Sequence, residues 1–102
     1  MKKIRIAFYD THSYDKNSFL EMNKWFQFEI EYFDFKLNEK TAAAAKDFDA
    51  VCIFVNDIAD RVVVGILKDE NVKLIALRCA GFNNVDMKAC SDFGIEVVRV
   101  PS

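Results

Sequence analysis

Five apolar segments typical of β-strands alternate with helical segments, and this alternation constrains the fold more than any other feature. The predicted strands are residues 3–9, 28–34, 49–55, 73–78 and 95–100. The predicted helices are residues 18–26, the TAAAAK segment at 41–46 with Asn38 as N-cap, a helix behind Asp60, and a helix from Asp86 to the C-terminal cap Gly94. Such alternation folds almost always as a parallel sheet with right-handed crossovers.

The order of the strands follows from their hydrophobicity. Residues 50–55 (AVCIFV) and 74–77 (LIAL) are continuous apolar runs, which indicates central strands covered on both faces. Residues 28–33 and 95–98 alternate apolar residues with glutamates, which indicates edge strands. The predicted fold class is therefore α/β, a flavodoxin-like doubly wound parallel five-stranded sheet of order 2-1-3-4-5.

The helices also have predicted faces and positions. The third helix should bury an apolar face made of Val62, Val63, Ile66 and Leu67, and the fourth should bury Ala89, Cys90 and Phe93. Crossover handedness would place helices two to four on one face of the sheet. The other face lacks a final covering helix, so one side of strands three and four would stay exposed, and we expect a homo-oligomer that buries it.

Composition and charge exclude several classes of function. The chain has 102 residues, 52% of them hydrophobic, which suits one globular domain. A net charge of -2 with interspersed signs predicts neither a nucleic-acid partner nor a membrane partner. The cysteines, Cys52, Cys79 and Cys90, show no C-x-x-C spacing, so neither disulfides nor a metal site is expected, and a reducing cytoplasm is the predicted location.

The strand ends are the candidate site, since ligands of such sheets bind beyond the carboxyl ends of the strands. The loops at residues 10–12, 56–57 and 78–84 should form one rim. Backbone N–H groups around Ala80 and Gly81 could cradle a carboxylate, although the local pattern alone favours the alternative that Gly81 only supplies a turn dihedral. His12 is typical of a solvated surface residue, and Asn56 with Asp57 of a turn-forming pair.

No cofactor-binding residue is assigned. The three glycines, Gly65, Gly81 and Gly94, cannot form a G-x-G-x-x-G fingerprint, and there is no Walker motif. The polar residues expected to close the turn and cap the next helix are Asn83, Asn84 and Asp86. Cys79 and Cys90 have no strongly cationic neighbours, so buried apolar roles are expected for both.

Several motifs resemble the D-2-hydroxyacid dehydrogenases, and within them the bacterial fermentative D-lactate dehydrogenases. The motifs are YDK at 14–16, FEIEYFDF at 28–35, EKTA at 39–42, AVCIFVND at 50–57, IALRCAGFNNVD at 75–86 and VVRVP at 97–101. The resemblance implies that residues 1–102 are most of a substrate-binding domain. It also implies that backbone groups at Ala80 and Gly81 hold the carboxylate of a small 2-oxo or 2-hydroxy acid.

The same resemblance implies that the catalytic machinery lies beyond Ser102. An NAD-binding Rossmann domain, absent from this chain, would carry the dinucleotide glycines, the substrate-clamping arginine and a histidine–glutamate acid–base pair. Neither His12 nor Arg78 would then be catalytic. The implied parent reaction reduces pyruvate to D-lactate with NADH, while the 102-residue chain alone is expected to bind no NAD and to be inactive.

Two other interpretations stay open from the residues alone. A receiver-like phosphoacceptor domain would use Asp57 as acceptor, but it needs paired acids after strand one and a lysine after strand five, where the chain has Asp10 and Arg99. The second interpretation is a non-catalytic flavodoxin-like interaction module.

Overall fold

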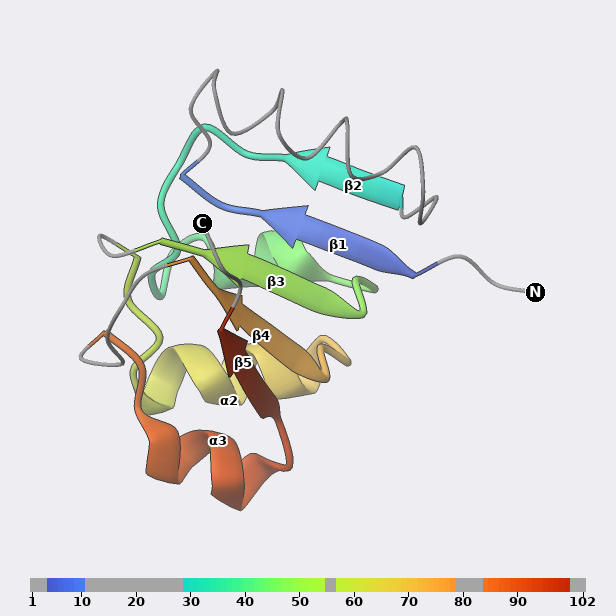
Figure 1. The fold of residues 1–102 in the computed structure, drawn as a ribbon. Coiled ribbons are helices and arrows are strands. Elements are labelled where there is room, and N and C mark those ends of the chain that lie inside the picture. The colour runs from blue at the N-terminus through green and yellow to red at the C-terminus, as the bar shows by residue number, and fades with distance from the viewer. Residues whose placement is uncertain (1–3, 11–28, 55–56, 79–83, 100–102) are drawn as a thin grey trace.

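The computed structural model describes residues 4–10, 29–54, 57–78 and 84–99, which contain a five-stranded parallel sheet of order β2-β1-β3-β4-β5 (Figure 1). The strands are β1 (Arg5–Phe8), β2 (Glu29–Tyr32), β3 (Ala50–Ile53), β4 (Leu74–Leu77) and β5 (Glu96–Arg99). The helical elements are the 3₁₀ helix η1 (Ala42–Ala45), α2 (Arg61–Asp69) and α3 (Met87–Phe93). The predicted sheet order is confirmed, and the helix predicted at 18–26 lies outside the described residues.

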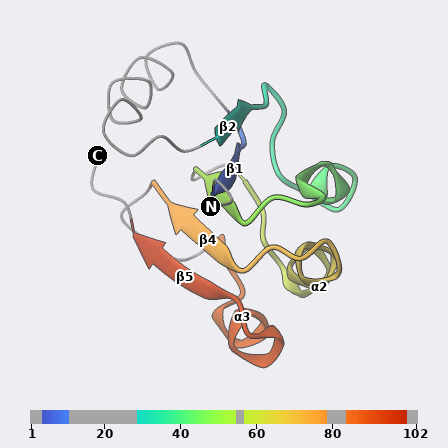
Figure 2. The same ribbon diagram turned by 90° about the vertical axis from the view of Figure 1, so that its right-hand side faces the viewer.

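One face of the sheet carries η1, α2 and α3, as crossover handedness predicted (Figure 2). Right-handed crossovers from β3 to β4 and from β4 to β5 place both α-helices on the same side. The strand side chains on this face join the helices in one buried apolar core, to which the sheet contributes Ala7, Val51, Ile53, Ile75 and Leu77.

The second face is covered unevenly. On β3 every side chain is buried, including Ala50 and Cys52, so the expectation that strand three is exposed on one side was wrong. On β4 the alternate side chains Leu74 and Ala76 are only half-buried, and Val98 on β5 is 41% exposed. From β3 to β5, the incompletely covered apolar surface therefore lies on the last two strands.

Helix α2 confirms its predicted start and corrects its predicted face. The carboxylate of Asp60 accepts a hydrogen bond of 2.9 Å from the N–H of Val63, which is the geometry of an N-cap. Val63, Val64 and Leu67 are buried, whereas Val62 is 53% exposed. Because successive residues lie about 100° apart around a helix, the core-facing stripe is turned from the predicted one toward Val64.

The alanine-rich segment forms a 3₁₀ helix, and its predicted N-cap was wrong. With three residues per turn, Ala42 and Ala45 lie on the same side, and both are fully buried. Thr41 is the N-cap residue and makes no side-chain capping bond. Asn38 acts in the preceding turn, because its side-chain oxygen accepts from the N–H of Lys40 at 2.8 Å and from that of Thr41 at 3.2 Å.

Helix α3 confirms both predicted ends. The carboxylate of Asp86 accepts from the N–H of Ala89 at 2.9 Å. Gly94 ends the helix in the left-handed conformation, with φ of 73°. Ala89 and Cys90 are buried as predicted, and the half-buried Phe93 packs against the core.

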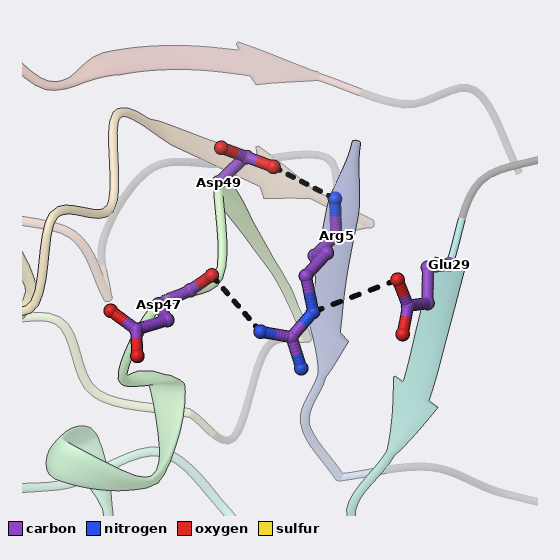
Figure 3. Close-up of polar contacts among 4 residues, drawn as sticks. All are labelled: Arg5, Glu29, Asp47 and Asp49. Atoms are coloured by element: carbon purple, nitrogen blue, oxygen red, sulfur yellow. Dashed lines mark hydrogen bonds and ion pairs between the residues drawn. The ribbon is translucent and has the colours of Figure 1, made fainter. Parts of the chain in front are cut away.

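Arg5 organises the amino edge of the sheet (Figure 3). Its backbone N–H donates to the Asp49 carboxylate at 2.9 Å, and its guanidinium donates to the Asp47 carbonyl at 3.3 Å. Its Nε lies 3.8 Å from the Glu29 carboxylate. The guanidinium also lies 4.4 Å from the centre of the Phe48 ring. These contacts join β1, β2 and the start of β3 at the edge opposite the predicted rim.

Candidate functional site

The parallel strands point their carboxyl ends to one edge, where the predicted rim lies (Figure 1). Four polar residues of this rim belong to the described part of the chain: Asp10, Asp57, Arg78 and Asn84. The two predicted substrate-binding residues, Ala80 and Gly81, lie outside it. The other rim candidates outside it are His12, Asn56, Cys79 and Asn83.

Asp57 joins the loop after β2 to the loop after β3. Its side chain is fully buried, with 0% of its surface exposed. One carboxylate oxygen accepts a hydrogen bond of 2.7 Å from the N–H of Leu37, and the other accepts one of 2.6 Å from the N–H of Phe54. The carboxylate thus replaces water for two backbone donors that would otherwise lack an acceptor.

Burial also changes the acidity of Asp57. Desolvation raises the pKa of its carboxyl group to about 6, although the hydrogen bonds from Leu37 and Phe54 oppose this rise. The negative charge of Asp10 raises the pKa further, and the positive charge of Lys36 lowers it. The pKa of Asp57 therefore lies well above the usual range of an aspartate.

Asn84 joins the loop after β3 to the loop after β4. Its carboxamide nitrogen donates to the carbonyl of Phe54 at 2.9 Å and to that of Asp57 at 3.0 Å. Beside it, Ala59 and Val85 form an isolated parallel bridge, in which the N–H of Ala59 donates to the Asn84 carbonyl at 2.9 Å. The side chains of Asp57 and Asn84 thus connect the loops that follow β2, β3 and β4 at the carboxyl edge of the sheet.

Arg78 adds a cation to this edge. Its guanidinium lies 5.4 Å from the centre of the Phe8 ring and 5.6 Å from that of the Phe54 ring, within the range of cation–π attraction. Its backbone N–H donates to the carbonyl of Ile53 at 3.0 Å, which extends the pairing of β3 and β4 by one bond. The guanidinium of Arg78 therefore lies close to aromatic rings of the residues that end β1 and follow β3.

The phosphoacceptor interpretation of Asp57 is not supported by this geometry. A phosphoacceptor needs a carboxylate oxygen that a phosphoryl donor can reach, whereas Asp57 is inaccessible and both of its oxygens accept backbone hydrogen bonds. Asp10 is itself only 7% exposed. The acids that follow β1 and β3 are therefore buried structural groups.

The described residues lack several kinds of site. They contain no cluster of three or more His, Cys, Asp or Glu side chains placed to hold a metal. Gly65 lies inside α2 and Gly94 caps α3, so neither can open a phosphate loop. None of the helices in this part of the chain has the length and apolar character that crossing a membrane requires.

Cys90 has the apolar role that its surroundings in the sequence predicted. Its side chain is 1% exposed and belongs to the core. Burial raises the pKa of the Cys90 thiol, with a smaller contribution from the charge of Asp86. A thiol that stays protonated at neutral pH is a poor nucleophile, so the side chain acts as a small apolar residue.

The sequence did not predict the contacts of Asp57 and Asn84 with distant loops. Asn56 and Asp57 have the local pattern of a turn, and Asn84 has that of a turn or a cap. No local signal distinguishes a side chain that bonds its own turn from one that bonds a loop 20 or 30 positions away. The two residues were therefore found only from the folded structure.

Comparisons with known proteins agree with the motifs. The family model for the catalytic domain of the D-isomer specific 2-hydroxyacid dehydrogenases matches residues 6–102 of the sequence. The chain is 54% identical to D-lactate dehydrogenase of Escherichia coli, over 97% of this chain and 30% of that protein. It is 50% identical, with the same coverage, to 2-hydroxyacid dehydrogenase homolog 1 of Schizosaccharomyces pombe.

Solved structures show the same similarity. The apo structure of the E. coli D-lactate dehydrogenase superposes with a TM-score of 0.94, over 97% of this chain and 32% of that one. The pyruvate reductase of Chlamydomonas reinhardtii is 42% identical with a TM-score of 0.88, over 98% of this chain and 30% of that one. The NAD-complexed 2-hydroxyacid dehydrogenase of Lactobacillus delbrueckii is 25% identical with a TM-score of 0.85, and the match covers 96% of this chain and 30% of that one.

The chain spans about 30% of the length of these relatives. Neither the receiver-like interpretation nor the interaction-module interpretation is favoured by these matches.

Proposed function

Because the chain belongs to the D-isomer specific 2-hydroxyacid dehydrogenases, we propose that residues 1–102 form the substrate-binding portion of an NAD-dependent D-lactate dehydrogenase. The parent enzyme is the longer protein that also contains the NAD-binding domain. It reduces pyruvate to D-lactate as NADH is oxidised to NAD. The observation that carries this proposal is 54% identity to a D-lactate dehydrogenase over 97% of the chain.

The role of this chain in the reaction is to bind and orient the 2-oxo acid. Backbone N–H groups at Ala80 and Gly81 hold the substrate carboxylate, and the cation of Arg78 increases the local attraction for an anion. NAD supplies the hydride when bound to the other domain. The histidine that donates the proton and the arginine that clamps the substrate also belong to that domain.

The chain alone therefore neither binds NADH nor reduces pyruvate. It has no dinucleotide fingerprint among its three glycines, and its single histidine, His12, is not assigned to catalysis. The parent enzyme acts in the cytoplasm, in keeping with the spacing of the three cysteines in residues 1–102. The interspersed charges of residues 1–102 favour neither nucleic acid nor a membrane as a partner.

We propose that the 102-residue chain forms a homo-oligomer. The half-buried Leu74 and Ala76 and the exposed Val98 present apolar surface on β4 and β5, which a second copy would cover. Multi-angle light scattering of the chain at micromolar concentration should show a dimer or larger species. A monodisperse monomer that melts cooperatively and binds no hydrophobic dye would contradict this assembly.

The test of the proposed function is pyruvate-dependent oxidation of NADH by the parent enzyme, with chiral analysis of the product. D-Lactate is expected, and the 102-residue chain alone should give no reaction and no calorimetric NADH binding. Longer 2-oxo acids and phenylpyruvate, assayed in parallel, decide which substrate is preferred. L-Lactate as product, or no turnover of any 2-oxo acid, would disprove the proposal.

A further inference from the structure

Asp57 lies at the point where the order of the strands reverses. In the order β2-β1-β3-β4-β5, the chain moves outward in one direction from β1 to β2 and in the other from β3 to β5. Doubly wound sheets bind their ligands outside the carboxyl ends of the strands at this point. Asp57 follows β3 there, and Asp10 follows β1.

Arg78 and Asn84 both contact the loop that Asp57 holds. The Arg78 guanidinium lies over the Phe54 ring, with 5.6 Å to its centre. The Asn84 carboxamide donates to the carbonyls of Phe54 and Asp57. The position of Phe54 is in turn set by the 2.6 Å hydrogen bond from its N–H to the Asp57 carboxylate.

We propose that Asp57 is a positioning residue for the 2-oxo acid site of the parent enzyme, and that its ionised carboxylate holds in place the loop residue Phe54, which Arg78 and Asn84 both contact. The proposal rests on the proposed function. Asp57 itself is fully buried, so its side chain is not accessible to a substrate. It acts through the loops that it joins.

Ionisation matters because both hydrogen-bond partners of the carboxyl group are donors. The N–H groups of Leu37 and Phe54 each point at one of its oxygens. In the protonated carboxyl group one of the two oxygens becomes a hydroxyl oxygen, which is a weaker acceptor than a carboxylate oxygen, so one of the two bonds would weaken. Protonation of Asp57 therefore loosens either the loop after β2 or the loop that carries Phe54.

In the described part of the chain, three groups near Asp57 carry or could carry charge. Asp10 after β1 disfavours the charge of Asp57, and Lys36 after β2 favours it. The Tyr9 hydroxyl stays neutral, because burial and, to a smaller degree, the charge of Asp57 raise its pKa. Among the described residues, Asp10 and Lys36 are thus the neighbours whose charges shift the pKa of Asp57, in addition to the larger effect of burial.

Asp57→Asn in the parent enzyme tests the proposal, with Asp49→Asn as the matched control. Asp49 also accepts a backbone N–H from a distant segment, but at the amino edge (Figure 3). At pH 8 we expect Asp57→Asn to raise KM for pyruvate about tenfold, with kcat and KM for NADH within about twofold of the wild type. Asp49→Asn should leave all three within about twofold.

The pH profile separates positioning from a general structural role. As the pH falls from 8 to 5, the wild-type carboxyl group becomes neutral, so the KM ratio between Asp57→Asn and the wild type should shrink. Asp10→Asn removes a neighbouring negative charge, so the pH at which KM rises should be lower in that variant than in the wild type. This second variant provides the same test if Asp57→Asn does not fold.

Three results would overturn the proposal: a KM ratio that is independent of pH, an equal loss of NADH affinity, or an equal effect of Asp49→Asn. For Asp10→Asn, the contradicting result is that KM for pyruvate rises at the same pH as in the wild type. Failure of the proposed function looks different, because the wild-type parent enzyme would then not reduce pyruvate at any pH.

Discussion

The N–H of Arg5 donates a 2.9 Å hydrogen bond to the Asp49 carboxylate (Figure 3), and the N–H of Asp49 donates a bond of the same length to the carbonyl of Arg5. The two residues are 44 positions apart in the chain. Their reciprocal bonds start the pairing of β1 with β3, which continues with Ile6 opposite Ala50. The register of these two strands is thus set at the amino edge.

Asp49→Ala should lower the free energy of unfolding by about 1–2 kcal/mol, because the N–H of Arg5 loses its acceptor in a half-buried position. Urea unfolding followed by circular dichroism measures this loss. Asp47→Asn is the control, because Asp47 contacts Arg5 through its main-chain carbonyl, which the substitution keeps. The free energy of unfolding of this variant should differ from that of the wild type by less than about 0.5 kcal/mol. Equal losses of unfolding free energy in the two variants would contradict the stabilising role of the Asp49 side chain.

The glycines Gly94 and Gly65 should respond to alanine with opposite signs. Gly94 has φ of 73° and nothing within 4 Å of an added Cβ, so Gly94→Ala costs about 1 kcal/mol through backbone strain alone. Gly65 lies inside α2, and an added Cβ would meet Phe93 at 3.7 Å, which is ordinary contact. Gly65→Ala should stabilise the protein by up to about 1 kcal/mol. Thermal melting of both variants checks the signs.

The corrected face of α2 predicts different costs for two neighbouring valines. Val64→Ala removes buried methyl groups from the core and should cost about 2 kcal/mol. Val62→Ala changes a side chain that is 53% exposed, so the free energy of unfolding, measured in urea, should change by less than about 0.5 kcal/mol. If the two costs were reversed, the helix would face the sheet as the sequence pattern predicted.

The buried Asp57 should make stability depend on pH. Its pKa is raised to about 6 in the folded protein from 3.8, so the folded state binds the proton more tightly than the unfolded state does. This contribution is fully present below pH 3.8 and is lost as the pH rises through about 6. Relative to Asp57→Asn, the wild type should lose about 1 kcal/mol of unfolding free energy between pH 5 and pH 7.5. Urea titrations at several pH values measure this difference. If the unfolding free energies of the wild type and Asp57→Asn changed in parallel with pH, Asp57 would not titrate in this range.

The proposed carboxylate contact predicts a specific kinetic defect for Gly81→Val in the parent enzyme. A branched side chain would obstruct the approach of the substrate carboxylate to the backbone, so KM for pyruvate should rise by about tenfold or more while KM for NADH stays nearly constant. Folding must be checked first by circular dichroism, because the turn would also be strained. An unchanged KM in a folded variant would leave Gly81 with a conformational role only.

Local chemistry determined much of this fold. Asp60 and Asp86 cap their helices, and Gly94 ends α3, because each of these effects needs only residues within one helical turn. The continuous apolar runs of β3 and β4 and the glutamates of β2 and β5 were enough to order the sheet, since burial on both faces excludes charge. The family motifs are likewise a property of the sequence alone.

Tertiary structure decided what depends on contacts between distant segments. Val62 and Val64 are chemically identical, and only the docking of α2 on the sheet selects which of them is buried. The alanine segment is short enough for the neighbouring chain to impose a 3₁₀ turn on it. Asp57 has the local pattern of a turn residue, yet folding removes it from water and places it between two backbone N–H groups. Its raised pKa and its contacts with the rim follow from that burial, which local pattern does not encode.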